Sequence, residues 1–240
     1  RVLFRSGWEV VGCPSAQKNR PGVNPLTPEH TVETIRRVRA RDAASFIIFV
    51  MHWNYELELY PQPAQRQLAH DLIAEGVDAI VGLHSHVAQG GELVNGKPIL
   101  YGLGNWFFPA RQLGHLHLAF PPISRRQLAL ELILRDAREC DVRFHWHSFD
   151  PERCSLDHEQ TEDWNGSIIQ DLSPFLGMGH EEYVRWFRSH RAQKAMLPIY
   201  QNYRHTRRNR IKDKYVLLRQ WAIRRLVAAG LKSKLSSRGS

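Results

Sequence analysis

Three short, predominantly apolar runs lie within the first hundred residues of the chain. The longest, over residues 46–51, is rich in β-branched and aromatic side chains, and shorter runs occupy residues 78–82 and 98–101. A run of this length that is apolar at successive positions is typical of a strand buried on both faces, as in a parallel sheet. Each of the three runs is therefore predicted to form a short buried strand.

Two further segments have the spacing of amphipathic helices. After Thr27 and Pro28, which favour the start of a helix, apolar side chains recur every three residues, and a helix is expected to run to about Arg41. A second helix is expected over residues 63–75, where Gly76 ends the pattern. Helices that alternate with buried strands indicate an α/β fold.

The pattern changes in the middle of the chain. Residues 127–134 and 141–147 each alternate apolar and polar side chains, which is typical of strands with one face on the core and one face in water. These segments predict an antiparallel hairpin that turns His145 and His147 toward its polar face, where they are not expected to bind a metal. From residue 165 onward the pattern is helical.

Basic charge is concentrated at the end of the chain. The 240 residues carry a formal net charge of +9, but residues 180–240 contain 16 basic and 3 acidic side chains, whereas the remainder contains 17 basic and 21 acidic ones. We therefore expect a mildly acidic domain over residues 7–150 and a basic helical extension over residues 165–240. The longest uninterrupted apolar run has six residues, far below the about 20 that a membrane-spanning helix needs.

The beginning of the chain has an unusual sequence. Residues 1–6 resemble the in-frame translation of a common sequencing-adapter end, and the first methionine is Met51. We expect residues 1–6 to be a sequencing artefact and the natural chain to extend upstream of Gly7. The three cysteines are widely spaced and odd in number, so they predict neither a disulfide framework nor a metal clip. They fit a reduced compartment best. Because this sequence contains neither a membrane-spanning segment nor a signal peptide, a cytoplasmic or membrane-associated location is expected.

Histidines follow two of the predicted buried strands. His52 comes directly after residues 46–51, and His84 and His86 come directly after residues 78–82. The carboxyl ends of parallel strands lie at one edge of a sheet, where loops converge to form sites. Neutral imidazole is a common ligand of divalent transition metals. The three histidines are therefore candidate metal ligands, with an ordinary pair of loop histidines as the alternative for the last two.

A hydrolytic metal centre also needs carboxylate and amide groups. Glu56 and Glu58 follow the first histidine and could support its ligands, although a solvated surface acid is the favoured interpretation for Glu58. Asn105 follows two glycines after the third strand and is a candidate for the same supporting role or for contact with substrate. Phe107 and Phe108, which come next, are expected to pack in the core.

These motifs together resemble the CapA family of capsule and poly-γ-glutamate synthesis proteins, within the calcineurin-like metallophosphoesterase superfamily. The family pattern has His-Trp-Gly-x-Glu-Tyr, then Gly-His-His-Pro-His, and later Tyr-Ser-Leu-Gly-Asn-Phe. The corresponding segments here are residues 52–57, 82–86 and 101–106, in the same order and spacing. The resemblance covers about residues 7–150 and does not include the basic extension.

The resemblance implies a fold and a set of ligands. The fold would be part of a metallophosphoesterase-like α/β sandwich of two sheets flanked by helices. His52, His84 and His86 match metal positions of the superfamily, and two divalent metal ions of unknown identity are implied for the full-length protein. Glu56 and Asn105 are the candidates for a supporting or substrate-binding role.

The chain also departs from the family pattern. A Gly, a His and a Pro of the pattern are replaced here by Asn54, Leu83 and Ser85. The family's upstream Gly-Asp, Asn-Leu-Glu and Asn-Asn-His motifs, which supply carboxylates, an asparagine and a fourth histidine, do not occur in this sequence. We therefore expect this chain to be the C-terminal part of a CapA-like protein and to be inactive by itself.

Two kinds of function follow from these observations. One is a metal-dependent hydrolase of the phosphoesterase type, with a site that is incomplete in this chain. The other is a non-enzymatic component of capsule or polyglutamate assembly, which binds an anionic polymer such as polyglutamate or an anionic membrane surface. Leu218, Ala222 and Leu226 share one face of the basic extension, and a helix docked on its own domain is the equally weighted alternative. Nucleic acid binding is disfavoured because no recognition motif accompanies the charge.

Overall fold

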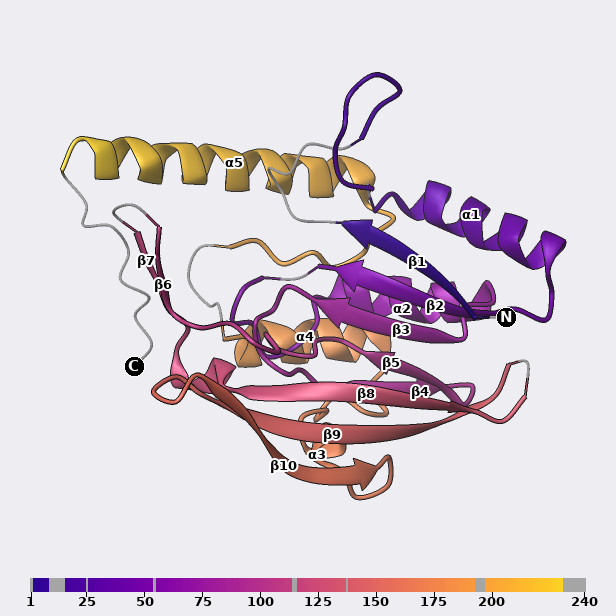
Figure 1. The fold of residues 1–240 in the computed structure, drawn as a ribbon. Coiled ribbons are helices and arrows are strands. Elements are labelled where there is room, and N and C mark those ends of the chain that lie inside the picture. The colour runs from indigo at the N-terminus through magenta and orange to yellow at the C-terminus, as the bar shows by residue number, and fades with distance from the viewer. Residues whose placement is uncertain are drawn as a thin grey trace.

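The central feature of the fold is a five-stranded sheet. The computed structural model describes residues 2–8, 16–24, 26–53, 55–113, 116–136, 138–192 and 197–230 (Figure 1). The strand order is β1 (Val2–Trp8), β2 (Phe46–His52), β3 (Ala79–Leu83), β5 (Lys97–Leu100) and β4 (Gly91–Val94). All neighbours are parallel except β4, which pairs antiparallel with β5 at one edge. The three strands predicted from apolar runs are confirmed as β2, β3 and β5.

Helices cover one face of this sheet. The helices of the described residues are α1 (Pro28–Arg41), α2 (Pro63–Ala74), α3 (Ile168–Asp171), α4 (His180–His190) and α5 (Thr206–Ala228). Ile35 of α1, Leu72 of α2 and Phe187 of α4 belong to one apolar cluster with Ile47 and Phe49 of β2. The two helices predicted in the first half of the chain are confirmed as α1 and α2.

A second sheet covers the opposite face (Figure 1). It contains three antiparallel strands, in the order β10 (Ser155–Asp163), β9 (Cys140–Asp150) and β8 (Arg126–Leu134). Phe46 of β2 packs in a cluster with Leu132, and Leu100 of β5 packs in a cluster with Trp146. The β2 run is apolar at successive positions because its two faces meet these two layers. The predicted hairpin is confirmed as β8 and β9, and the architecture is α/β with two sheets and helices.

The remaining elements are short or extend from this body. A small hairpin of β6 (Arg111–Leu113) and β7 (Leu116–Leu118) precedes a single 3-10 turn, Pro122–Ser124. The helical region after residue 165 is only partly separate from the α/β body. Its helix α4 packs into the main core, whereas α5 extends along one side of the body (Figure 1). Within the described ranges, no helix has the length and apolar character needed to cross a membrane.

A buried carboxylate at the amino end of β3 binds three basic side chains. The Asp78 side chain is fully buried, and it accepts hydrogen bonds from the side chains of Arg39 and Lys97 and, at 3.2 Å, from Arg138. It also accepts the backbone N–H of Ile47 at 2.9 Å. Asp78 thereby ties α1, β2, β5 and the β8–β9 turn together, a role that its position at the start of a strand did not predict.

A second buried ion cluster joins α2 to the edge strand β4. The guanidinium of Arg66 donates two hydrogen bonds, of 2.9 and 2.8 Å, to the carboxylate of Glu92. The same carboxylate is bound by His70 at 2.8 Å and by the hydroxyl of Tyr101. Arg66 also donates to the carbonyl oxygen of Met178 at 2.8 Å, just before α4. This cluster therefore fixes the approach of α4 to the sheet.

Candidate metal centre

The sheet register places two of the candidate ligands side by side. β2 ends at His52, and β3 ends at Leu83, directly before His84. In the parallel ladder His52 pairs with Leu83, and the backbone N–H of Trp53 donates to the carbonyl oxygen of Leu83 at 3.3 Å. The ring centroids of His52 and His84 consequently lie 4.6 Å apart.

A tight turn after β3 brings the third histidine to the same place. His84 and His86 have φ angles of 88° and 58°, in the left-handed region that non-glycine residues seldom adopt. Between them, the hydroxyl of Ser85 donates to the carbonyl oxygen of Val87 at 2.8 Å, and the carbonyl oxygen of Ser85 accepts the N–H of Leu57 at 2.7 Å. The ring centroids of His84 and His86 lie 5.7 Å apart. Backbone conformations of this kind cost about 1–3 kcal/mol each and concentrate at functional sites.

Gly82 allows β3 and the segment after β5 to approach closely beneath this turn. A Cβ atom at Gly82 would lie 2.0 Å from the carbonyl oxygen of Tyr101. That oxygen accepts the indole N–H of Trp53 at 3.1 Å, and Trp53 is fully buried. Only glycine fits here, so this glycine of the motif has a structural role in positioning the histidine turn.

Asn105 contacts the third histidine, and the second sheet holds Asn105 in place. The Nδ1 atom of His86 lies within hydrogen-bonding distance of the side-chain oxygen of Asn105. The backbone N–H groups of Asn105 and Trp106 both donate to the side-chain oxygen of Gln127, the second of them at 2.8 Å. Gln127 belongs to β8 and is buried. Sequence reasoning missed Gln127, because no local pattern signals a contact between the loop after β5 and a strand of the second sheet.

The two glutamates after β2 have different environments. The ligand atoms of Glu56, His84 and His86 all lie within 4.8 Å of one another, and Glu56 Oε1 is 4.0 Å from His86 Nε2. Glu58 is not the solvated acid that the sequence favoured, because its side chain is fully buried. It accepts the backbone N–H groups of Leu59 and Ala192, at 3.0 and 2.9 Å. Glu58 thus links this loop to the segment after α4. Glu56 instead lies beside His84 and His86, which together with His52 we call the histidine edge.

The histidine edge favours uncharged imidazole rings. Burial and the neighbouring rings of His52 and His86 lower the pKa of His84 to about 4. Burial and His86 also lower the pKa of His52 below its usual range. At neutral pH, His52 and His84 are therefore neutral, and each retains the nitrogen lone pair that a metal ion requires.

The other residues considered from the sequence lie elsewhere or differ from expectation. Phe107 was expected in the core, but it is 48% exposed, with its ring edge against Phe149. His145, on β9, is bound by Glu131 at 2.9 Å and by Thr161 at 2.9 Å, on the second sheet and apart from the histidine edge. Asn54, His115 and the side chain of His117 lie outside the described residues.

Comparison with known proteins gives a consistent picture for the first half of the chain. Residues 6–110 match the family model described as Bacterial capsule synthesis protein PGA_cap. Over 94 residues the chain is 40% identical to the PGA biosynthesis protein CapA of Bacillus subtilis, and over 95 residues it is 32% identical to the capsule biosynthesis protein CapA of Bacillus anthracis. It is 33% identical over 114 residues to a probable polyglutamine synthesis accessory protein of Mycobacterium tuberculosis.

These matches cover only part of each protein. They include 39%, 39% and 44% of this chain, and 24%, 23% and 30% of the respective relatives. The matched family region ends at residue 110, so it contains β2, β3, β5 and all of the candidate site residues but not the second sheet or α5.

Proposed function

Because the chain belongs through residues 6–110 to the CapA family of bacterial capsule synthesis proteins, we propose that its histidine edge binds a divalent metal ion in a phosphoesterase-type hydrolase site. The proposed setting is the synthesis of a capsule polymer such as poly-γ-glutamate. The observation that carries the proposal is that His84 lies beside His52 of the adjacent strand and beside His86 in the same turn, with the ligand atoms of Glu56, His84 and His86 within 4.8 Å of one another.

The residues at this edge fit a metal ion chemically. The side-chain oxygen of Asn105 can only accept, so the Nδ1 atom of His86 carries the proton of their hydrogen bond. This fixes the tautomer in which His86 Nε2 has a free lone pair, and the exposed carboxylate of Glu56 lies beside that nitrogen. Fixing a ligand histidine through its other ring nitrogen is the usual arrangement around protein-bound metals.

The position of each residue indicates its role in the proposed site. His52, His84 and His86 would hold the ion, Glu56 would add negative charge, and Asn105 would orient His86. A bound divalent ion supplies a Lewis acid for a phosphoryl or carbonyl oxygen. Gln127 keeps Asn105 in place and so transmits the packing of the second sheet to the site.

Calorimetric titration with Mn²⁺ and with Zn²⁺ tests this proposal. We expect His84→Ala to lower the affinity by at least about 100-fold, since it removes a ligand, and Asn105→Ala to lower it by about 10- to 100-fold, since it removes a supporting group. His158→Ala is the control, because His158 is an exposed histidine on β10. Equal affinities for the wild type and His84→Ala would contradict the proposal.

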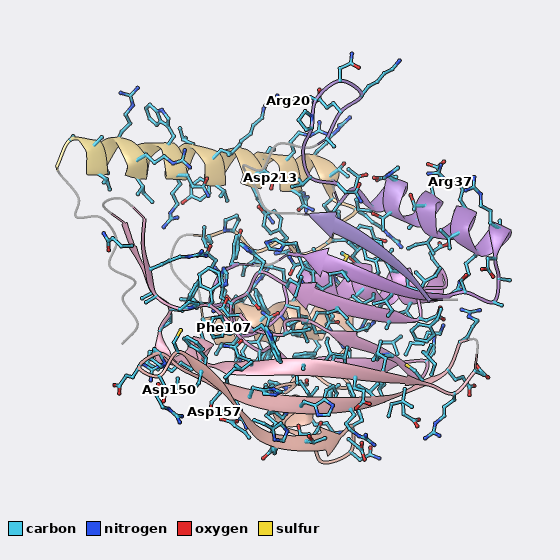
Figure 2. All side chains as sticks on the ribbon, in the orientation of Figure 1. Arg20, Arg37, Phe107, Asp150, Asp157 and Asp213 are labelled. Carbon is cyan, nitrogen blue, oxygen red and sulfur yellow. The ribbon has the colours of Figure 1, made fainter. Side chains whose placement is uncertain are left out.

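A second candidate function is suggested by the outer surface of α5. Six large apolar side chains of α5 are exposed, among them Ile211, Leu218 and Trp221 at 67%, 62% and 56%. The helix contains eight basic residues and a single acidic one, Asp213. Asp213 accepts the hydroxyl of Tyr200 at 2.8 Å on the side of the helix that faces the body (Figure 2). The outer surface therefore combines apolar side chains with basic charge.

This combination favours attachment to an anionic membrane surface over a purely polar partner. Apolar side chains of an interfacial helix enter the lipid boundary while basic side chains contact anionic headgroups. A soluble polyanion such as polyglutamate would use the basic groups but would leave the exposed apolar groups in water. We therefore propose that α5 acts as a peripheral membrane contact.

Vesicle co-sedimentation across a range of salt concentrations tests the role of α5. We expect the full chain to bind vesicles that contain phosphatidylserine, and to bind less at high salt because screening weakens the attraction. The double change Leu218→Gln and Trp221→Gln should reduce binding strongly, whereas Ile123→Gln, at another exposed apolar position, should not. Three results would contradict the proposal. They are binding that does not change with salt concentration, equal binding by the double variant and by Ile123→Gln, and binding to neutral-lipid vesicles that equals binding to vesicles with phosphatidylserine.

A further inference from the structure

A small cavity adjoins the histidine edge and is formed largely by residues beyond the matched family region. Its volume is about 140 Å³. Its lining comes from the loop after β5, the segment around the 3-10 turn, and the strands β8 and β9 with the turn that follows them. The lining residues that matter here are Asn105, Phe108, Phe120, Ser124, Arg125 and Phe149. We call this cavity the Arg125 pocket.

The wall of the Arg125 pocket is shared with the candidate metal centre. The ring of His86 lies 4.4 Å from that of Phe120, and the rings of Phe120 and Phe108 meet edge to face at 4.9 Å. Asn105 lines the pocket and also contacts Nδ1 of His86. A group held in the pocket would therefore lie next to the histidine edge.

The polar groups of the pocket are mostly hydrogen-bond donors. The hydroxyl oxygen of Ser124 is buried and has no hydrogen-bond partner among the described residues, and no acidic residue is found among the residues that line the pocket. The guanidinium of the exposed Arg125 forms no ion pair with any described acidic group. The side-chain oxygen of Gln127, a buried acceptor of the lining, already receives two backbone N–H groups, and the Asn105 side-chain oxygen contacts His86.

From this arrangement we propose that the Arg125 pocket binds a carboxylate that adjoins an aliphatic segment. The aromatic wall would contact the methylene groups of that segment, Ser124 would donate to the carboxylate, and Arg125 would pair with it through two parallel N–H donors. A γ-linked glutamate polymer repeats this group, because each unit carries a free α-carboxylate next to two methylene groups of the polymer backbone, so the proposal deepens the proposed function by naming a contact for its substrate.

The location of the pocket explains why a substrate contact would be built there. If Arg125 holds the carboxylate of one polymer unit, the amide bonds next to that unit lie beside His86. This contact does not use any of the candidate metal ligands. Arg125 and Ser124 are thus expected to bind and position the polymer and not to take part in the chemistry. The α5 surface, by contrast, has no pocket lining in common with this site.

The test is an NMR titration of the full chain with a γ-linked glutamate tetramer in a buffer that contains a metal chelator. We expect Arg125→Gln to weaken binding by about tenfold or more and Ser124→Ala to weaken it by several-fold, because each removes a hydrogen bond to a charged group. Arg37→Gln is the matched control, since it removes the same charge from α1, far from Phe107 and the pocket (Figure 2). A γ-linked tetramer in which each α-carboxylate is replaced by a primary amide, and which therefore lacks these charges, is expected to bind at least tenfold more weakly.

The outcomes separate this inference from the proposed metal function. Loss of tetramer affinity in Arg125→Gln but not in Arg37→Gln supports the pocket, whether or not the protein also binds Mn²⁺. Equal affinities in these two variants, equal affinities for the carboxylate and amide tetramers, or displacement of the tetramer by inorganic phosphate at an equal concentration would overturn the proposal. Thermal unfolding of each variant verifies that it is folded.

Discussion

The Glu92→Gln variant is expected to lose about 3–5 kcal/mol of unfolding free energy, the range found when one partner of a buried ion pair is removed. Arg66 and Glu92 are almost fully buried, with 8% and 6% of their side-chain surfaces exposed. The substitution keeps the shape of the side chain but leaves the Arg66 guanidinium buried without its counter-charge. Denaturant unfolding monitored by tryptophan fluorescence measures the change.

The control for this prediction is Glu75→Gln. Glu75 also binds an arginine, Arg36, but this pair lies at the surface, where the arginine side chain is 67% exposed. Surface pairs contribute little, because water and salt screen the charges. A loss in Glu75→Gln as large as that in Glu92→Gln would show that burial is not the cause.

The same carboxylate is expected to contribute to unfolding at low pH. Burial alone would raise the pKa of Glu92, but hydrogen bonds from His70 and Arg66 outweigh it and lower this pKa from 4.5 to about 2. The folded state therefore binds the Glu92 proton less tightly than the unfolded state does. The resulting stability is fully present above about pH 4.5 and is lost as the pH falls toward 2. Glu92→Gln should show a correspondingly shallower loss of stability over this range.

Asp78→Asn is expected to be the other strongly destabilising change, also by about 3–5 kcal/mol. It leaves Arg39, Lys97 and Arg138 without the carboxylate that they share, and the side chains of Arg39 and Lys97 are only 14% and 16% exposed. Burial raises the pKa of Asp78, but the hydrogen bonds from Lys97, from the N–H of Ile47 and from Arg39 outweigh it and lower this pKa below its usual range. Its contribution is therefore present above the usual carboxyl range and is lost as the pH falls.

Asp141→Asn provides the comparison, because Asp141 pairs with Arg135 where both side chains are at least half exposed. Asp78 lies at the amino end of β3, whereas the histidines lie beyond its carboxyl end. Folded Asp78→Asn protein should therefore bind Mn²⁺ with the affinity of the wild type. A destabilisation equal to that of Asp141→Asn, or a selective loss of metal affinity, would contradict this separation of stability from site.

The parts of the fold that could be predicted are those that local patterns determine. β2 is covered on both faces, so its sequence is apolar at successive positions, and α1 and α2 carry an apolar stripe toward the same core. His52 and His84 lie side by side because two parallel strands end together, whereas His86 is placed beside His84 by the turn after β3.

The parts that were missed depend on contacts between distant segments. β10 contains a single apolar residue, Leu156, and is held by its pairing with β9. Glu58 is buried because the segment after α4 folds over it, and Gln127 of the second sheet supports Asn105 in the loop after β5. Phe107 is exposed because the loop after β5 leaves the core at that point. None of these long-range contacts has a local signature in the sequence.

Metal binding by the three histidines is tested directly by a crystal structure of the protein soaked with Mn²⁺, with anomalous diffraction data to locate the ion. We expect an anomalous peak within coordinating distance of ring nitrogens of His52, His84 and His86, and its absence in crystals of His84→Ala. A peak confined to other histidines, such as His145 and His158 on the second sheet, or no peak at concentrations that saturate the protein in solution, would contradict it.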